Sequence, residues 1–546
     1  MSDYWSVLIS IRTLPFLPPL WRTCSVLLII CGGLWSASPV DALEKQAPPN
    51  LIFILTDDQG FGDASCQNPE CRFQTPNIDR LASEGISFRN AHSSDTVCTP
   101  SRYGLLTGRY CWRTRLKRGV LGADGPCLID EERLTLPKLL RNTGYATAMV
   151  GKWHLGMTFP GTFGKRDWTI PVTNMPLDKG FDYFYGIPAS MNYGVLAWYE
   201  GRTPITPPSL FTGKKPNDLY VDFRYKPPYE KTPEEVTGVQ DKNPIEIAPD
   251  FIDNQALTRF TDKSIAWMKQ HVQQNPEQPF FLYLPYTSPH YPVCPLPEYQ
   301  GKGQCGGYGE FLIETDDHIG RLLATLEKLG VDQNTIIMFS SDNGPESSWR
   351  QRLEVYQHAS SGPFRGGKRD IYEGGHRVPF FVRWPAGIAQ PGRTSETLMG
   401  QVDVLATMAD LLQINLPDSA GEDSISFLPA LKDPQAVLNR KPMVNHAANG
   451  RYSLTEGTWK VIAPHRKNQF ELYDLGTDPA ETRDVSAEHP DMVRELTEKL
   501  TEIVASGRTT AGKPQPNDTG FWQDLTWMTP ERYSKDVQHG KESLTE

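Results

Sequence analysis

Short apolar runs alternate along this chain with segments of helical pattern. Residues 50–55, 279–284 and 335–340 lack a regular polar alternation, which is typical of strands buried on both faces of a sheet. Segments with a helical pattern lie among them, including residues 253–271 and 311–329. Strands that alternate with helices form largely parallel sheets. We therefore predict an α/β fold with a large, mostly parallel or mixed sheet sandwiched by helices.

The pattern changes in the last part of the chain. A break over residues 429–442 is followed by short alternating segments near 452–455 and 459–462 and by a helical pattern over 490–504. These features predict a smaller domain made of an antiparallel sheet and one helix. The expected parts are a large domain over residues 49–435, a smaller domain over 436–510 and a polar, proline-containing tail over 511–546.

The first 42 residues have the pattern of an export signal. Arg12 and Arg22 belong to a long leading segment before an apolar stretch near residues 24–35, and Val40-Asp41-Ala42 offers a small-residue cleavage site. Because the apolar stretch is short and contains two glycines, no stable membrane span is expected. We predict an exported protein, periplasmic or extracellular, with a lipoprotein site at Cys31 as the weaker alternative.

The charge balance limits the class of partner. The chain has 55 Lys and Arg residues against 65 Asp and Glu residues, a net charge of −10, which argues against a general nucleic-acid-binding protein. Any anion-binding site must then be a local group of cations. One such group is the segment 109–118, interpreted here as a solvated loop or, alternatively, as a basic wall near a substrate. Its members are Arg109, Arg113, Arg115, Lys117 and Arg118, beside Tyr110 and Trp112.

Seven cysteines lie beyond the export signal. Six of them fall into pairs that are close in sequence, namely Cys66 with Cys71, Cys111 with Cys127, and Cys294 with Cys305. In an exported protein such pairs suggest local disulfides. Six reduced and partly buried thiols explain the same pattern, so both readings stay open.

Polar side chains follow three of the predicted strands. Asp57 and Asp58 come after the first, His290 after the second, and Asp342 and Asn343 after the third. The carboxyl ends of parallel strands meet at one edge of a sheet, where open α/β sheets bind ligands. Adjacent carboxylates repel each other unless a cation holds them. Asp57 and Asp58 therefore indicate a hard, oxygen-preferring metal ion, and a solvated turn is the alternative.

The seventh cysteine, Cys98, stands at the start of a predicted helix. Pro100 suits the first turn because its missing N–H is not needed there. The backbone N–H groups and the dipole at a helix start favour an anion, and Arg102 follows one turn later on the same face. A buried structural cysteine is the alternative interpretation.

Further cations stand at the ends of other elements. Lys152 and His154 follow the predicted strand 144–150 and are two residues apart, so in an extended segment their side chains point the same way. Both can donate hydrogen bonds to one anion. Lys368, on the Gly-rich loop 362–368, can reach the same anion.

The order of these motifs resembles that of a known family. Cys98-Thr99-Pro100-Ser101-Arg102 with the following Leu-Leu-Thr-Gly, then Gly-Lys-Trp-His, Ser-Pro-His, Asp-Asn-Gly and a C-terminal Leu-Tyr-Asp-Leu succeed one another between residues 49 and 504. This arrangement resembles the type I, arylsulfatase-like sulfatases of the alkaline phosphatase superfamily. The resemblance implies an alkaline phosphatase-like fold and a sulfuric ester hydrolase. It also implies that a formylglycine-generating enzyme converts Cys98 to formylglycine (3-oxoalanine).

The resemblance also implies the roles of the site residues. It implies one Ca²⁺ held by Asp57, Asp58, Asp342 and Asn343 together with the converted Cys98, and oxygen ligands are those that calcium prefers. The resemblance further implies that hydrated formylglycine attacks the sulfur, that His290 is the general acid and that His154 takes the proton of the second hydroxyl. The residues expected around the sulfate are Arg102, Lys152, His154, His290 and Lys368.

Two other functions stay open from the sequence. One is a phosphomonoesterase or phosphodiesterase of the same superfamily, for which the usual zinc-binding histidines are not evident. The other is a non-catalytic binder of sulfated glycans. For a sulfatase, a terminal sulfate on a sulfated saccharide is the expected substrate, with small aryl sulfates as the rival.

Overall fold

The computed structural model describes residues 47–540 except 193, 214–244, 437, 439, 441 and 467–468. The predicted export signal, residues 1–42, lies outside the described residues. None of the helices in the described part of the chain has both the length and the apolar character needed to span a membrane.

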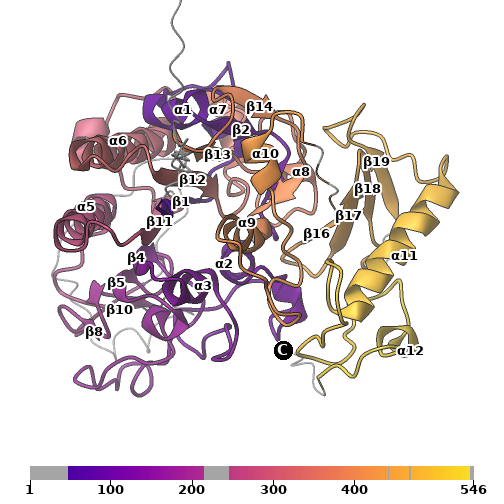
Figure 1. Cartoon of the computed structure of the whole chain (residues 1–546), viewed down its shortest axis with the longest axis horizontal. Helices are drawn as coiled ribbons and strands as arrows, with labels where there is room; N and C mark the ends of the chain where they lie inside the picture. The colour runs from indigo at the N-terminus through magenta and orange to yellow at the C-terminus, as the bar shows by residue number, and fades with distance from the viewer. Residues whose placement is uncertain are drawn as a thin grey trace, which may run out of the picture. The chain divides into compact units, whose positions relative to one another are not determined.

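A ten-stranded sheet forms the centre of the fold (Figure 1). Its middle strand, β1 (Asn50–Asp57), pairs in parallel with β11 (Phe280–Pro289) on one side and with β12 (Thr335–Ser341) on the other. Nearly all residues of these three strands are buried, which confirms the prediction made from their apolar runs. The other strands are β2 (Ile86–Phe88), β4 (Ala146–Lys152), β5 (Tyr183–Ile187), β7 (Tyr199–Glu200), β8 (Thr203–Pro204), β13 (Phe380–Arg383) and β14 (Arg393–Ser395).

The sheet is mixed. Its strand order is β14-β2-β13-β12-β1-β11-β4-β5-β7-β8, with a parallel centre from β12 to β5. The pairings of β13 with β12 and of β7 with β5 are antiparallel. Small additional sheets are made by β3 (Ala91–His92) with β15 (Met399–Gly400), and by β6 (Val195–Leu196), β9 (Leu210–Thr212) and β10 (Ile245–Ile247).

Helices pack against the large sheet in two groups (Figure 1). In the first group, α6 contacts α1 and α5, and all three lie against strands β11 to β13; in the second, α2 contacts α3 and α9. The predicted α/β architecture is therefore correct. The helix bounds are α1 (Pro76–Ser83), α2 (Cys98–Thr107), α3 (Leu136–Asn142), α5 (Ala256–Gln274), α6 (Gly306–Leu329), α7 (Trp349–Tyr356), α8 (Glu373–His376), α9 (Val404–Leu411) and α10 (Leu428–Lys432).

The C-terminal part contains the predicted antiparallel sheet and helix. Helix α11 (Pro490–Ser506) packs against β17 and β18 of a four-stranded sheet. The described residues from Ala47 onwards belong to one compact unit, and the boundaries proposed at 435 and 510 stay predictions. The strands are β16 (Met443–His446), β17 (Tyr452–Glu456), β18 (Trp459–Ile462) and β19 (Glu471–Asp474), and a short α12 (Pro530–Tyr533) follows in the tail.

Ion pairs hold the arginine-rich segment 109–118 to the loop before α10 and to the tail. Arg113 is fully buried and donates from Nε and Nη2 to the carboxylate of Asp423 at 2.9 and 2.8 Å. Its guanidinium lies 4.2 Å from the ring centroid of Trp112. Arg109, also buried, binds Asp518 of the tail at 2.8 Å. Both interpretations from the sequence, a solvated loop and a wall near the substrate, are wrong for these two arginines, because both are buried and the carboxylates of Asp423 and Asp518 already pair with them.

We expect Arg113→Ala to lower the free energy of unfolding by about 3–5 kcal/mol, because Asp423 would remain as a buried carboxylate without its cation. Urea unfolding measures this change. Arg115→Ala is the control, since Arg115 is only half-buried and donates to the carbonyl oxygens of Pro126 and Cys127. Unchanged stability combined with lost turnover in Arg113→Ala would restore the substrate-wall interpretation.

The predicted local disulfides are absent. None of the pairings Cys66/Cys71, Cys111/Cys127 and Cys294/Cys305 forms in the structure. Residues close in sequence can pack in different surroundings: Cys294 lies in the main apolar core, whereas Cys305 packs with Phe73 and Tyr308 in a separate cluster. Cys111 and Cys127 share the main core but are not bonded to each other.

Candidate active site

The three polar strand ends meet at one edge of the large sheet. Asp58 donates its backbone N–H to Asp342 Oδ1 at 3.2 Å, and Asn343 Nδ2 donates to Asp58 Oδ1 at 2.8 Å. His290 Nε2 lies 3.8 Å from Asp58 Oδ2. Because β1, β11 and β12 are parallel neighbours, their carboxyl ends bring these side chains together, as the sequence predicted. The carboxylates of Asp57, Asp58 and Asp342 are fully buried.

Helix α2 places Cys98 beside these buried carboxylates. Cys98 is the first residue of the helix, with Pro100 in its first turn, and every residue of α2 is buried. Arg102 donates from Nε and Nη2 to Asp342 Oδ2 at 3.0 and 2.7 Å and from Nη1 to the carbonyl oxygen of Lys152 at 2.9 Å. The arginine thus links the helix to the ends of β12 and β4.

The two lysines approach the carboxylates from other elements. Lys152, at the end of β4, donates from Nζ to Asp57 Oδ2 at 2.5 Å and to Ser190 Oγ at 2.8 Å. Lys368 Nζ lies 2.7 Å from Asp58 Oδ1 and 2.8 Å from Asp58 Oδ2. The structure therefore brings both predicted lysines to the same centre.

His154 stands beside the start of α2. Its backbone has a positive φ of 61°, and its carbonyl oxygen accepts a hydrogen bond from Thr99 Oγ1 at 2.9 Å. Nε2 lies 2.9 Å from the carbonyl oxygen of Leu121, so Nε2 carries the proton and Nδ1 is the acceptor in the neutral ring. All ten predicted site residues are thus at or next to one buried centre.

Two further residues support the lysines, and the sequence pattern did not single them out. Ser190 receives the hydrogen bond from Lys152, and Glu346 Oε2 lies 3.5 Å from Lys368 Nζ. Glu346 also holds Arg369 through both guanidinium Nη atoms, at 2.5 and 2.8 Å. The only feature of the sequence that could have pointed to Glu346 is its position three residues after Asn343, in the same loop.

Burial determines the protonation of the potential nucleophile and bases. Burial raises the pKa of the Cys98 thiol to about 12, although Lys152 and Lys368 lower it. An unmodified thiol at this position is therefore protonated at neutral pH and is a weak nucleophile. Burial also lowers the pKa of His154, and Lys152 and Arg102 lower it further. The pKa of His290 is lowered by burial against the opposing effect of Asp57, so both imidazoles are neutral here.

The carboxylate group fits a divalent cation with oxygen ligands. Within the described residues, Asp57 Oδ1 and Asn343 Oδ1 are buried and accept no hydrogen bond, which is costly for polar atoms unless a ligand satisfies them. The ligand atoms of Asp57, Cys98 and Asp342 lie within 4.8 Å of one another, as do those of Asp57, Asp58 and His290. A set dominated by carboxylate and amide oxygens suits calcium better than zinc.

A second group of potential metal ligands is already neutralised. His92, Glu373 and His376 are buried together, but Lys460 Nζ lies 2.9 Å from Glu373 Oε1 and 3.2 Å from His376 Nε2. The ammonium supplies the cation that these groups require. We interpret this cluster as a packing contact between α8 and β18.

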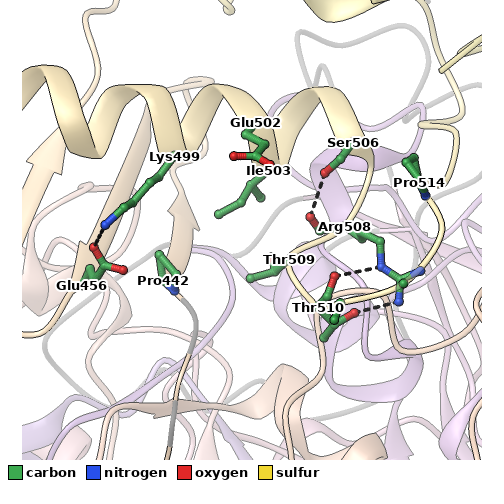
Figure 2. Close-up of a pocket in the computed structure, with 12 residues that line it drawn as sticks. Pro442, Glu456, Lys499, Glu502, Ile503, Ser506, Arg508, Thr509, Thr510 and Pro514 are labelled. Atoms are coloured by element: carbon green, nitrogen blue, oxygen red, sulfur yellow. Dashed lines mark hydrogen bonds and ion pairs between the residues drawn. The ribbon is translucent and has the colours of Figure 1, made fainter. Parts of the chain in front are cut away.

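A cavity of ≈ 480 Å³ lies beside α11 and is separate in sequence from these residues (Figure 2). Its cations are engaged by the protein itself: Lys499 pairs with Glu456, and Arg508 donates to Thr510 (Figure 2). The cavity therefore offers a ligand no charged group comparable to the carboxylates and cations around Cys98.

The part of the chain that carries these residues is similar to known proteins. A family model described as Sulfatase matches residues 49–414, and one described as N-sulphoglucosamine sulphohydrolase, C-terminal, matches residues 364–506. The chain is 32% identical over 532 residues to N-acetylgalactosamine-6-O-sulfatase of Bacteroides thetaiotaomicron, covering 90% of this chain and 98% of that protein. It is 30% identical over 481 residues to arylsulfatase A of Homo sapiens, covering 86% and 84%.

Solved structures show the same likeness. A structure described under the metabolism of multiple glycosaminoglycans by Bacteroides thetaiotaomicron superposes with a TM-score of 0.71 at 32% identity, covering 84% of this chain and 99% of that one. A phosphonate monoester hydrolase of Agrobacterium radiobacter superposes with a TM-score of 0.54 at 19% identity, covering 84% and 96%, which shows a shared fold alone. The first family model includes every candidate site residue from Asp57 to Lys368.

Proposed function

The chain belongs to the sulfatase family and is a sulfuric ester hydrolase, and from this premise we propose that it hydrolyses a terminal sulfate ester of a sulfated carbohydrate at the centre around Cys98. The observation that supports the centre is the meeting of Cys98, at the start of a buried helix, with three carboxylates and three cations. The relative named as an N-acetylgalactosamine-6-O-sulfatase is matched over 98% of its length. We therefore propose 6-sulfated N-acetylgalactosamine as the first substrate to test.

We propose that Cys98 acts as formylglycine, made by a formylglycine-generating enzyme. The raised pKa of the thiol disfavours an unmodified cysteine nucleophile. A hydrated aldehyde offers one hydroxyl for attack on sulfur and a second whose deprotonation allows the sulfate to leave, which neither cysteine nor serine provides.

We propose that one Ca²⁺ is held by Asp57, Asp58, Asp342, Asn343 and the modified residue 98. When bound, it supplies positive charge that stabilises the oxygens of the nucleophile and the sulfate. The orphaned oxygens of Asp57 and Asn343 support this assignment.

The chain's own cations orient and stabilise the sulfate. Lys152 pairs with Asp57, Lys368 pairs with Asp58 and Arg102 pairs with Asp342, so all three cations lie at the centre. A sulfate ester repels an attacking oxygen, and these charges offset that repulsion and the charge that builds in the transition state.

The two histidines serve as proton carriers. His154 Nδ1 is the acceptor nitrogen of the neutral ring, which suits removal of a proton from the second hydroxyl. His290 Nδ1 lies 2.6 Å from the carbonyl oxygen of Tyr291 and donates to it, so Nε2 faces the centre. The negative charge of a bound sulfate ester favours protonation of Nε2, which then donates to the leaving alcohol.

The test is kcat/KM for 6-sulfated N-acetylgalactosamine, other sulfated saccharides, an aryl sulfate and the matching aryl phosphate. We expect the sulfates to be hydrolysed at least ~10²-fold better than the phosphate, because a site built around a modified nucleophile and one oxygen-bound metal differs from a zinc phosphatase. Preference for the phosphate would support the phosphoesterase alternative. Tight binding of sulfated saccharides without hydrolysis, by protein that carries formylglycine, would support the non-catalytic binder.

A further inference from the structure

We propose that Cys71 and Cys305, which are free thiols in the structure, form a disulfide in an oxidising compartment and so fasten the segment before α1 to the start of α6. Neither the predicted local pairs nor the sulfatase chemistry includes this link, which joins residues far apart in sequence.

The backbone sets the two cysteines opposite each other. Gln304 donates its N–H to the carbonyl oxygen of Arg72 at 2.9 Å, so the segments 71–72 and 304–305 lie side by side. Cys71 precedes the acceptor residue and Cys305 follows the donor residue. The two cysteines therefore flank one hydrogen bond, and Cys305 is close enough to Cys71 to raise the pKa of the Cys71 thiol; a disulfide needs a Cα separation of about 4.4–6.8 Å.

The side chains share one apolar cluster. Cys305 packs with Phe73, Tyr308 and Leu312, and Cys71 lies against the same cluster. The other possible partners lie elsewhere. The Cys66 side chain hydrogen-bonds to Asp79, and Cys111, Cys127 and Cys294 are in the main core. The packing therefore selects Cys71 with Cys305.

A small oxidant can reach one of the two thiols. Cys71 lines a surface cavity of ≈ 590 Å³ together with Arg72 and Gln304, whereas Cys305 is fully buried. A small-molecule disulfide first exchanges with Cys71, giving a mixed disulfide and one released thiol. The Cys305 sulfur then displaces the second small thiol, so two protein S–H groups become one S–S bond and the oxidant takes up both hydrogens.

Burial also predicts slow exchange. Burial raises the pKa of both thiols to about 12, so few thiolates exist at neutral pH and oxidation should accelerate as the pH rises. This behaviour suits a permanent link better than a rapidly responding sensor.

The link would support the loop that carries Asp58. Tyr308, in the first turn of α6, donates from its hydroxyl to Asp63 Oδ2 at 2.6 Å, and Asp63 Oδ2 accepts the backbone N–H of Gly60 at 2.7 Å. A covalent tie at Cys305 therefore restrains the turn of α6 that holds this loop.

The experiment uses the full chain with and without oxidised glutathione, followed by alkylation and non-reducing peptide mapping. We expect a cross-linked peptide pair containing residues 71 and 305 in wild type and in the control Cys66→Ser. Reduction with dithiothreitol should lower the unfolding midpoint of both proteins by a few degrees. Cys71→Ser and Cys305→Ser should show no such shift.

Two results would overturn the proposal. The first is complete alkylation of both residues after oxidation of folded wild-type protein. The second is a cross-link that joins either residue to another cysteine. The peptide map of wild type decides the question even if a serine variant fails to fold, and the result does not depend on the substrate.

Discussion

Replacing Cys98 by alanine should lower kcat at least ~10³-fold, because it removes the group that attacks sulfur while leaving the surrounding charges in place. Cys98→Ser should be nearly as inactive, since serine has one hydroxyl and cannot release the bound sulfate as an aldehyde does. Steady-state kinetics with an aryl sulfate measures both losses.

Mass spectrometry of the peptide carrying residue 98 completes this test. We expect an aldehyde or its hydrate in active wild-type protein, and a sulfated serine that accumulates in Cys98→Ser after incubation with substrate. The matched control is Cys111→Ala, another buried cysteine, whose Sγ contacts Thr114 rather than the carboxylate group. Full turnover by protein with only unmodified cysteine at position 98 would disprove the mechanism.

Replacing Asp57 should have the second largest effect. Asp57→Asn keeps the size of the side chain but removes a charge from the proposed calcium site, so we expect loss of the ion and a fall in kcat of about 10³-fold. Asp57→Ala should in addition destabilise the protein, because Lys152 would lose the carboxylate 2.5 Å from its Nζ atom and remain buried.

Elemental analysis and calcium-dependent thermal unfolding measure the binding separately from turnover. In wild type, a chelator should lower the unfolding midpoint and added Ca²⁺ should restore it. The exposed carboxylate of Asp130 provides a control in Asp130→Ala. One equivalent of zinc and no calcium in active protein would show that the metal assignment is wrong.

The arrangement of the site could be anticipated from the sequence where it depends on strand order. The buried runs before Asp57, His290 and Asp342 require parallel neighbours, and parallel strands end at the same edge. The start of α2 at Cys98 agreed with the position of Pro100. The structure confirms this meeting of residues, while their catalytic roles stay proposals.

Contacts between distant segments could not be anticipated in the same way. Arginine is usually a surface residue, and only the fold shows that Arg113 is buried with Asp423 as its partner. Ser190 likewise lies in a loop with no pattern of its own and meets Lys152 only in three dimensions. The prediction of local disulfides was wrong for the same reason: disulfide pairing depends on which segments pack together and not on their separation along the chain.

The complete burial of α2 has a consequence for how active protein is made. An enzyme that modifies Cys98 must hold an extended stretch around it, and all ten residues of the helix are enclosed once the chain has folded. Modification and folding therefore compete in time, and each molecule that folds first is permanently excluded. The active fraction of a preparation should rise when synthesis is slowed or the maturation enzyme is abundant during translation, whereas adding that enzyme to purified, folded protein should recover nothing.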